Sequence, residues 1–222
     1  MKQPHPIKEL LYSNDQNFDG GRLLPVMEHF YTLQGEGMHS GKAAYFIRVG
    51  GCDVGCHWCD VKESWNAHVH PLVEMEPLLE LATQNPSGVV VITGGEPSLY
   101  PMDFTTEFLH KKGVAAHLET SGAYPLSGDW DWICLSPKKT SSPLPEIYRK
   151  AHELKVIVYN RNDLVWAQKQ AKAIRAAGNP CPLILQPEWS KREEVMPLIT
   201  EFTMQNPEWR VGIQTHKYLH LP

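Results

Sequence analysis

Residues 43–60 read AAYFIRVGGCDVGCHWCD and govern the architecture that we expect for this chain. The first seven, Ala43–Val49, form an apolar run interrupted only by Arg48, which is typical of a strand buried on both faces of a parallel sheet. Two glycines and three cysteines follow where that strand should end. The stretch therefore predicts a strand with a cysteine-rich loop at its carboxyl end.

Further apolar runs of similar length predict the remaining strands. They are Val89–Thr93, Val114–Glu119, Trp130–Leu135, Leu154–Tyr159, Pro182–Gln186 and Trp209–Thr215. The segments with helical character are Pro71–Gln84, Met102–Lys112, Asp163–Ala177 and Lys191–Gln205. Gly113 and Gly178 suit the carboxyl ends of two of these helices, and Asn162 suits the start of one.

Alternating strands and helices indicate right-handed crossovers between parallel strands. Roughly six or seven strands with only about four helices do not suffice for a closed eightfold barrel. We therefore expect an α/β fold, an incomplete (partial) TIM-like barrel of mostly parallel strands. We expect it to form a single domain over residues 1–222, with residues 1–24 as an N-terminal extension.

Polar or glycine-rich segments follow most of the predicted strands. They are Gly50-Gly51-Cys52, Gly94-Gly95-Glu96-Pro97, Thr120-Ser121-Gly122, Ser136-Pro137-Lys138, Gln186-Pro187 and His216-Lys217. Structural loops also collect glycine and proline. Folds of this class, however, place their sites at the C-terminal ends of the strands, so these segments together predict an active site at that edge.

Composition and charge narrow the class of protein. The 222 residues are 42% hydrophobic, with a net charge of −4, so a core can form and no nucleic-acid partner is favoured. No apolar run reaches the length of a membrane span, and Met1 to Tyr12 lacks the apolar segment of a secretory signal. Five cysteines without a paired framework indicate reduced thiols and a cytoplasmic location.

Cys52, Cys56 and Cys59 have the spacing C-x3-C-x2-C. Three thiolates on one short loop can each bind a different iron of a [4Fe–4S] cluster. The glycines beside them let the backbone fold closely around such a group. The fourth iron would remain open, which suits a reactive cluster better than a purely electron-carrying one.

A structural zinc site is the main alternative for this loop. Such a site needs four ligands, usually as two separated pairs, whereas here one C-x2-C pair is present with Cys52 and His57 nearby. Because His57 adjoins Cys56, joint ligation of one metal is awkward. Cys134 and Cys181 fall in or beside predicted strands, where a buried cysteine serves as a small apolar residue.

With these features the chain resembles the radical S-adenosylmethionine (SAM) superfamily. The resemblance rests on the cysteine spacing after the first strand and on Gly94-Gly95-Glu96-Pro97 after the second. It implies that Cys52, Cys56 and Cys59 hold a [4Fe–4S] cluster in a loop over residues 50–61. SAM would then occupy the fourth iron through its amino and carboxylate groups, with Gly94, Gly95 and Glu96 contacting its amino group.

Further motifs resemble the 7-carboxy-7-deazaguanine synthase family within that superfamily. They are Thr32-Leu33-Gln34-Gly35-Glu36-Gly37, Phe46-Ile47-Arg48, Glu119-Thr120-Ser121-Gly122, Leu135-Ser136-Pro137-Lys138, Leu185-Gln186-Pro187 and Gln214-Thr215-His216-Lys217-Tyr218-Leu219. Any one of them alone is weak. Their order, from about Pro25 to Pro222, makes the set specific.

The resemblance implies a ring-contracting lyase. Members of the family convert 6-carboxy-5,6,7,8-tetrahydropterin to 7-carboxy-7-deazaguanine with loss of ammonia, on the path to queuosine and related deazapurines. The cofactors implied are the [4Fe–4S] cluster, SAM and Mg²⁺. The partners implied are the pterin substrate, an electron donor such as flavodoxin or ferredoxin, and a second copy in a homodimer.

The resemblance also implies roles for individual residues. Those expected at SAM are Trp58, Asp60, Gly94, Gly95, Glu96, Ser121, Ser136, Pro137, Lys138 and Gln186. Those expected at the substrate are Leu33, Gln34, Gly35, Arg48, Thr93, His216 and, through its terminal carboxylate, Pro222, with Glu36 and Glu119 as weaker candidates. Arg48 would pair with the substrate carboxylate, which a guanidinium can bind bidentately.

Structural interpretations compete with several of these roles. Arg48 could reach solvent from the end of its strand, and Ser136-Pro137-Lys138 could form an ordinary turn. His216 could serve packing alone. Pro222 could belong to a frayed tail, as chain termini often do.

Val61 marks a departure from the family pattern. Many members carry threonine directly after the Cys-Asp pair, where its hydroxyl binds Mg²⁺, whereas this chain reads Cys59-Asp60-Val61. Mg²⁺ takes oxygen ligands, and valine offers none. We expect the ion to be bound more weakly or to be dispensable.

Two other functions compete with this interpretation. One is another small radical SAM enzyme, such as an activase that forms a glycyl radical on a protein; the glutamine-containing substrate loop and the C-terminal motif argue against it. The other is a non-enzymatic, zinc-stabilised binding module. Iron and sulfide content would separate the second from both enzymes, and the accepted substrate would separate the two enzymes.

Overall fold

The computed structural model describes residues 18–222, and the nine strands in this part of the chain form one open sheet. The strands are β1 (Leu23–Leu33), β2 (Ala43–Val49), β3 (Leu72–Glu74), β4 (Val89–Gly94), β5 (Ala115–Thr120), β6 (Trp132–Leu135), β7 (Glu153–Val158), β8 (Leu183–Pro187) and β9 (Trp209–Val211). Their order is β3-β1-β2-β4-β5-β6-β7-β8-β9. From β2 to β9 every neighbouring pair is parallel, whereas β1 is antiparallel to both β2 and β3. The unpaired ends at β3 and β9 make this a partial barrel.

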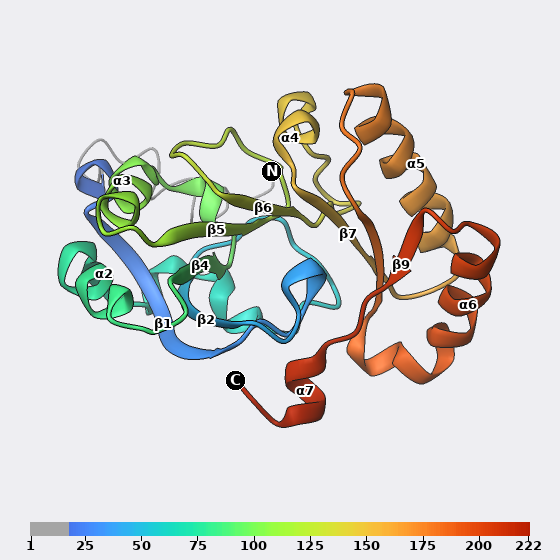
Figure 1. The fold of residues 1–222 in the computed structure, drawn as a ribbon, viewed down its shortest axis with the longest axis horizontal. Helices are drawn as coiled ribbons and strands as arrows, with labels where there is room; N and C mark the ends of the chain where they lie inside the picture. The colour runs from blue at the N-terminus through green and yellow to red at the C-terminus, as the bar shows by residue number, and fades with distance from the viewer. Residues whose placement is uncertain (1–17) are drawn as a thin grey trace, which may run out of the picture.

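Helices cover the outer, convex face of the sheet. They are α2 (Met75–Thr83), α3 (Asp103–Lys111), α4 (Pro145–Lys150), α5 (Asn162–Ala176) and α6 (Arg192–Gln205), whereas a further helix, α7 (Thr215–Leu219), contributes His216 to the cavity lining. In Figure 1, α2 and α3 flank one half of the sheet and α4, α5 and α6 the other, while α7 lies apart beside the C-terminus. No helix in this part of the chain is long and apolar enough to cross a bilayer.

The two faces of the sheet differ because side chains alternate along each strand. In β7, Leu154, Val156 and Val158 are buried in the core that the sheet shares with α5 and α6. Lys155 and Ile157 point to the other, concave face and line a cavity there. Burying an aliphatic side chain stabilises by about 1.5–3 kcal/mol, so the outer face supplies stability and the inner face is left for function.

The expected strands and helices are confirmed with shifts of one or two residues, apart from two segments. Pro71–Gln84, expected as one helix, contains strand β3 before α2, because its first residues pair with Leu23–Pro25 of β1. Trp209–Thr215, expected as one strand, ends at Val211, and Thr215 begins α7. Gly113 and Gly178 follow α3 and α5 with positive φ, as expected.

Sequence reasoning missed β1, α4 and α7 and misplaced one cap. Proline and charged residues interrupt β1, yet it is held by pairing with β2 along one side and β3 along the other. Asn162, expected as the N-cap of a helix, is the first residue of α5. The carboxylate of Asp163 accepts hydrogen bonds from the N–H groups of Tyr159 and Asn160, each at 2.8 Å, and organises that turn instead.

Candidate active site at the carboxyl ends of the strands

A cavity of about 250 Å³ opens at the carboxyl ends of the parallel strands. The residues assigned to the site from sequence that line it are Leu33, Gln34, Gly35, Arg48, Cys52, Cys56, Trp58, Cys59, Asp60, Val61, Thr93, Gly94, Gly95, Glu96, Ser121, Ser136, Lys138, Gln186, His216 and Pro222. Pro137 is the exception and does not line it. Segments far apart in the chain thus meet at the edge that the strand ends predicted.

The cysteine loop is anchored to its neighbours by backbone hydrogen bonds. The N–H of Cys52 donates to the carbonyl of Trp65 at 3.1 Å, and that of Glu96 donates to Gly51 at 2.8 Å. A Cβ atom on Gly95 would collide with the carbonyl of Gly51, so only glycine permits this approach. The loop after β2 and the loop after β4 are therefore fitted closely against each other.

The three thiols of this loop suit a cluster rather than a single ion. Cys52 is buried, Cys56 and Cys59 are half-buried, and all three are free. Residues 18–222 contain no group of three His, Cys, Asp or Glu side chains arranged to hold one metal ion. Thiolates that bind different irons of one cubane need not converge on a point, so the donor set fits [4Fe–4S]. Burial raises the pKa of Cys52 to about 12, so its thiolate needs a cationic partner.

The Glu96 carboxylate joins the ends of two strands. One oxygen accepts hydrogen bonds from the hydroxyls of Thr120 (2.6 Å) and Ser98 (2.7 Å). The other accepts the N–H of Ser121 at 2.8 Å and also its hydroxyl. Glu96 is almost completely buried. Its carboxylate therefore ties the loop after β4 to the end of β5.

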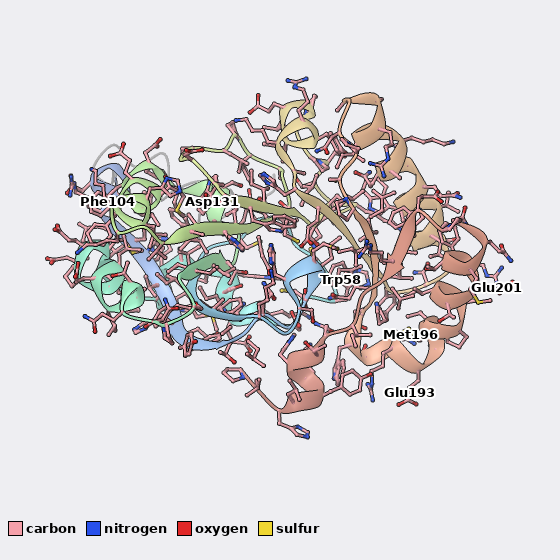
Figure 2. The ribbon with its side chains drawn as sticks, in the orientation of Figure 1. Trp58, Phe104, Asp131, Glu193, Met196 and Glu201 are labelled. Carbon is pink, nitrogen blue, oxygen red and sulfur yellow. The ribbon has the colours of Figure 1, made fainter. Side chains whose placement is uncertain are left out.

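Lys138 lies between the cysteine loop and the end of β6. Its ammonium donates to the hydroxyl of Ser136 at 2.6 Å and lies 5.2 Å from the ring centroid of Trp58. Trp58 lies near the middle of the molecule in Figure 2. Burial lowers the pKa of Lys138, whereas the nearby Cys56 acts in the opposite direction. The structure thus offers a cation close to one of the three thiols.

Arg48 is ion-paired at the cavity wall. Its Nε donates to Oε1 of Glu28 at 2.6 Å across the β1–β2 pair. Among the described residues its two Nη nitrogens have no hydrogen-bond partner. The Arg48 side chain is 19% exposed and lines the cavity.

A charged network forms the floor of the cavity. Lys155 pairs with Glu36 and lies 3.5 Å from Oε2 of Glu119. Gln214 donates to Glu36 at 2.8 Å, and Gln34 donates to Glu119 at 2.9 Å. Burial raises the pKa of Glu36, but Lys155 and the glutamine amides outweigh it and hold that pKa at about 2.

The C-terminal segment closes one side of the cavity. His216, expected at a strand end, lies in α7 instead and packs directly on Gly35, where a Cβ atom would strike its ring. Burial lowers the pKa of His216. Lys217 donates to Asp60 at 2.7 Å, and Pro222 lines the cavity. The last residues of the chain therefore contact both the loop after β1 and the cysteine loop.

Several lining residues were not assigned from sequence. They are Phe30, Thr32, Phe46, Val54, Trp65, Thr120, Lys155, Ile157, Pro187, Glu188, Trp189 and Gln214. Glu36 and Glu119, which the sequence offered as weaker candidates, also line the cavity. A signal existed for Lys155, which is the one charged residue in the apolar run Leu154–Tyr159. The isolated Phe30 and Trp189 gave none, because aromatic residues serve packing equally well. Cys134 and Cys181 are buried, as expected.

Comparisons with known proteins agree with this geometry. A model of the Radical SAM superfamily matches residues 46–164. The 7-carboxy-7-deazaguanine synthase of Flavobacterium psychrophilum is 54% identical over 91% of this chain and 94% of its own, and that of Synechocystis sp. is 45% identical over 96% and 97%. The crystal structure of QueE from Escherichia coli matches with a TM-score of 0.77 and 30% identity, over 91% of this chain and 100% of that one.

Proposed function

This chain belongs to the 7-carboxy-7-deazaguanine synthases of the radical SAM superfamily, and from that premise we propose how its cavity serves their reaction. The protein is a radical SAM deazaguanine synthase of queuosine biosynthesis. We propose that it converts 6-carboxy-5,6,7,8-tetrahydropterin to 7-carboxy-7-deazaguanine with release of ammonia. The observation that carries the assignment is one cavity lined both by the three cysteines and by the charged floor.

The family implies a [4Fe–4S] cluster and SAM. When bound, these groups supply a carbon radical that abstracts a hydrogen atom from the substrate. We assign the cluster to Cys52, Cys56 and Cys59, within the loop over residues 50–61. The chain's own task is to hold the reactants in register and keep water away from them.

We assign the SAM side of the cavity to the loops after β2, β4, β5, β6 and β8. The residues are Trp58, Asp60, Gly94, Gly95, Glu96, Ser121, Ser136, Pro137, Lys138 and Gln186. Gln186 supports this placement, because its buried Oε1 has no hydrogen-bond partner within residues 18–222. Lys138 suits an anionic group such as a carboxylate. Pro137 would act by shaping the turn, since it does not line the cavity.

We assign the pterin to the side formed by the loop after β1 and the C-terminal segment. The residues are Leu33, Gln34, Gly35, Arg48, Thr93, His216 and Pro222. With Nε held by Glu28, Arg48 presents its Nη groups to the pterin carboxylate. The terminal carboxylate of Pro222 suits the donor-rich amino-pyrimidine edge.

We propose that this chain shares four further features of the family. We propose an electron donor of the flavodoxin or ferredoxin type, a homodimer, a cytoplasmic location, and one radical SAM domain over residues 1–222. The proposed extension over residues 1–24 lies largely outside the described residues. For Mg²⁺ the residues do not fit, because Val61 has no oxygen and the adjacent Asp60 carboxylate is bound by Lys217.

Anaerobic turnover tests the proposed function. Reconstituted protein is mixed with SAM, a chemical reductant and 6-carboxytetrahydropterin, and 7-carboxy-7-deazaguanine is measured by chromatography. We expect product and 5′-deoxyadenosine to form together. Deoxyadenosine without the deazapurine, in protein with a full cluster, would contradict the substrate assignment.

A further inference from the structure

Lys155 is a charged side chain in the interior of the sheet. It lies in β7 with its side chain 4% exposed, on the face that lines the cavity. Its neighbours Leu154 and Val156 point to the opposite face and join the outer core. Lysine is almost never fully buried unless it is paired, so its partners should reveal what it does.

Those partners are two carboxylates of the cavity floor. The ammonium pairs with Oε2 of Glu36 and lies 3.5 Å from Oε2 of Glu119. The remaining oxygens accept glutamine amides, from Gln214 to Glu36 at 2.8 Å and from Gln34 to Glu119 at 2.9 Å. Each carboxylate is therefore held at one oxygen by the same lysine and at the other by an amide.

The network controls charge as well as orientation. Burial alone would lower the pKa of Lys155, but Cys134, Glu119 and Glu36 raise it well above its usual value. The same lysine contributes to holding the pKa of Glu36 at about 2 against burial. At neutral pH Glu36 is therefore a carboxylate that faces the Lys155 ammonium.

Fold stability is a weak explanation for this arrangement. Replacing a buried ion pair by apolar residues is often neutral or stabilising, and here a single lysine is shared between two carboxylate side chains. Both carboxylates line the cavity, and the buried Oε1 of Gln214, whose amide donates to Glu36, has no partner among the described residues. The floor is therefore rich in hydrogen-bond acceptors, which suits a ligand that presents several N–H groups.

We propose that Lys155 is a positioning residue, which holds the carboxylates of Glu36 and Glu119 turned into the cavity, where they accept hydrogen bonds from N–H groups of the bound tetrahydropterin. The inference rests on the proposed function, from which it takes the ligand. Lys155 itself acts through the two carboxylates: it donates to Glu36 and lies within ion-pair distance of Glu119.

Other titratable groups face the network from neighbouring elements. They are Cys134 in β6, Lys138 after β6, Glu153 in β7 and His216 in α7. Burial raises the pKa of Glu153, whose carboxylate accepts the N–H of Met38 at 2.7 Å and which lies outside the cavity lining. Glu153 is thus a buried acid on the same strand and face as Lys155, and it provides a matched control.

The test compares Lys155→Met with the wild-type holoenzyme across pH 6–9. Without the ammonium, only the glutamine amides oppose burial and the pKa of Glu36 rises, so its carboxylate is protonated at low pH and is regained as an acceptor as pH rises. We expect the KM for the pterin at pH 7 to increase about 10- to 100-fold, as for loss of charged hydrogen bonds. The ratio of wild-type to variant kcat/KM should shrink toward pH 9. An unchanged KM, or a ratio independent of pH, overturns the proposal.

Control variants distinguish a failure of this proposal from misfolding and from a failure of the proposed function. Glu153→Gln should shift Tm but leave the pterin KM and its pH profile unchanged. A KM increase equal to that of Lys155→Met overturns the proposal.

If Lys155→Met loses its iron or fails to fold, the variant Lys155→Arg provides the test. Lys155→Arg keeps the positive charge but displaces the two carboxylates. The KM for the pterin should therefore rise about 3- to 10-fold, while its pH profile stays that of the wild type. A KM equal to that of the wild type overturns the proposal. Wild-type protein that does not convert the pterin at all contradicts the proposed function instead.

Discussion

At the scale of single residues, the five cysteines fall into two groups according to their position in the fold. Cys52, Cys56 and Cys59 line the cavity, whereas Cys134 and Cys181 lie in or next to strands of the sheet, away from the cavity lining. A thiol at the cavity can reach a cofactor, and a thiol packed in the sheet cannot. The position of each cysteine in the fold therefore predicts its chemistry.

Removal of a cavity cysteine should abolish cofactor binding. We expect Cys56→Ala to lose the cluster and SAM cleavage, because a cubane with two protein thiolates is poorly held. Cys181→Ala should keep the cluster and lose only about 1 kcal/mol of stability, as for small deletions in a core. Iron and sulfide analysis with Tm measurements checks both. An unchanged iron content in Cys56→Ala would contradict the ligand assignment.

Val61 is a second residue with a testable consequence. We expect Mg²⁺ to stimulate this enzyme less than relatives with threonine there, and Val61→Thr to increase the stimulation, because a hydroxyl restores one oxygen ligand. The measurement is turnover with and without Mg²⁺ after chelation. Val54→Thr, which adds a hydroxyl elsewhere in the cavity, is the control. A strong Mg²⁺ requirement in the wild type, unaltered by Val61→Thr, would show that other groups hold the ion.

At the scale of elements, the site depends on the contact between the loops after β2 and β4. Gly95 donates its N–H to Val49 at 2.8 Å and lies against the carbonyl of Gly51. The two loops come from strands that are adjacent in the sheet, so parallel pairing of β2 with β4 brings them together. A small change at this contact should therefore disturb the cluster loop before it unfolds the sheet.

Gly95→Ala tests that contact. The added methyl group would collide with the Gly51 carbonyl, so the cysteine loop must move, and we expect at least a tenfold loss of SAM cleavage, equivalent to about 1.4 kcal/mol. Gly178→Ala is the control, because its Cβ would meet open space although its φ is positive. It should lose about 1 kcal/mol of stability from backbone strain with full iron content. Equal iron occupancy and activity in both variants would contradict the role of the contact.

At the scale of the whole molecule, the loop after the first strand and the C-terminal helix meet at one site. The loop after β1 and helix α7 are joined by a hydrogen bond from the N–H of Thr215 to the carbonyl of Gly35 at 2.9 Å. Figure 1 shows α7 and the C-terminus beside the β1–β2 side of the sheet rather than over β9. The C-terminal segment thus crosses the open side of the partial barrel and brings Pro222 to the cavity.

A C-terminal extension should interfere with that arrangement. If the Pro222 carboxylate binds the pterin, converting it to an amide bond with a short tag removes its charge. We expect the KM to rise at least tenfold, in the range for a lost charged hydrogen bond. SAM cleavage without substrate should be unaffected, and an N-terminal tag serves as the control. Normal KM in the C-terminally tagged protein would contradict this role.

Fold class and most of the site were predictable because their signals are local. Apolar runs of strand length identified β2 and β4 to β8, and short motifs at their ends identified the residues that line the cavity. The signals failed where tertiary pairing overrides local preference. Strand β1 contains Pro25, Glu28 and His29, and its extended form comes from ladders with β2 and β3 rather than from its own pattern.

The amino-acid sequence alone was sufficient for the class of fold, the cysteine loop and the edge of the sheet that bears the site, because strand periodicity and ligand spacing are properties of neighbouring residues. Only the tertiary structure revealed that Lys155 joins Glu36 to Glu119, that Glu28 holds Arg48, and that α7 packs on Gly35. These contacts join residues up to 181 positions apart, as in the pair Gly35 and His216. Their energies depend on burial and on partners that no local pattern encodes.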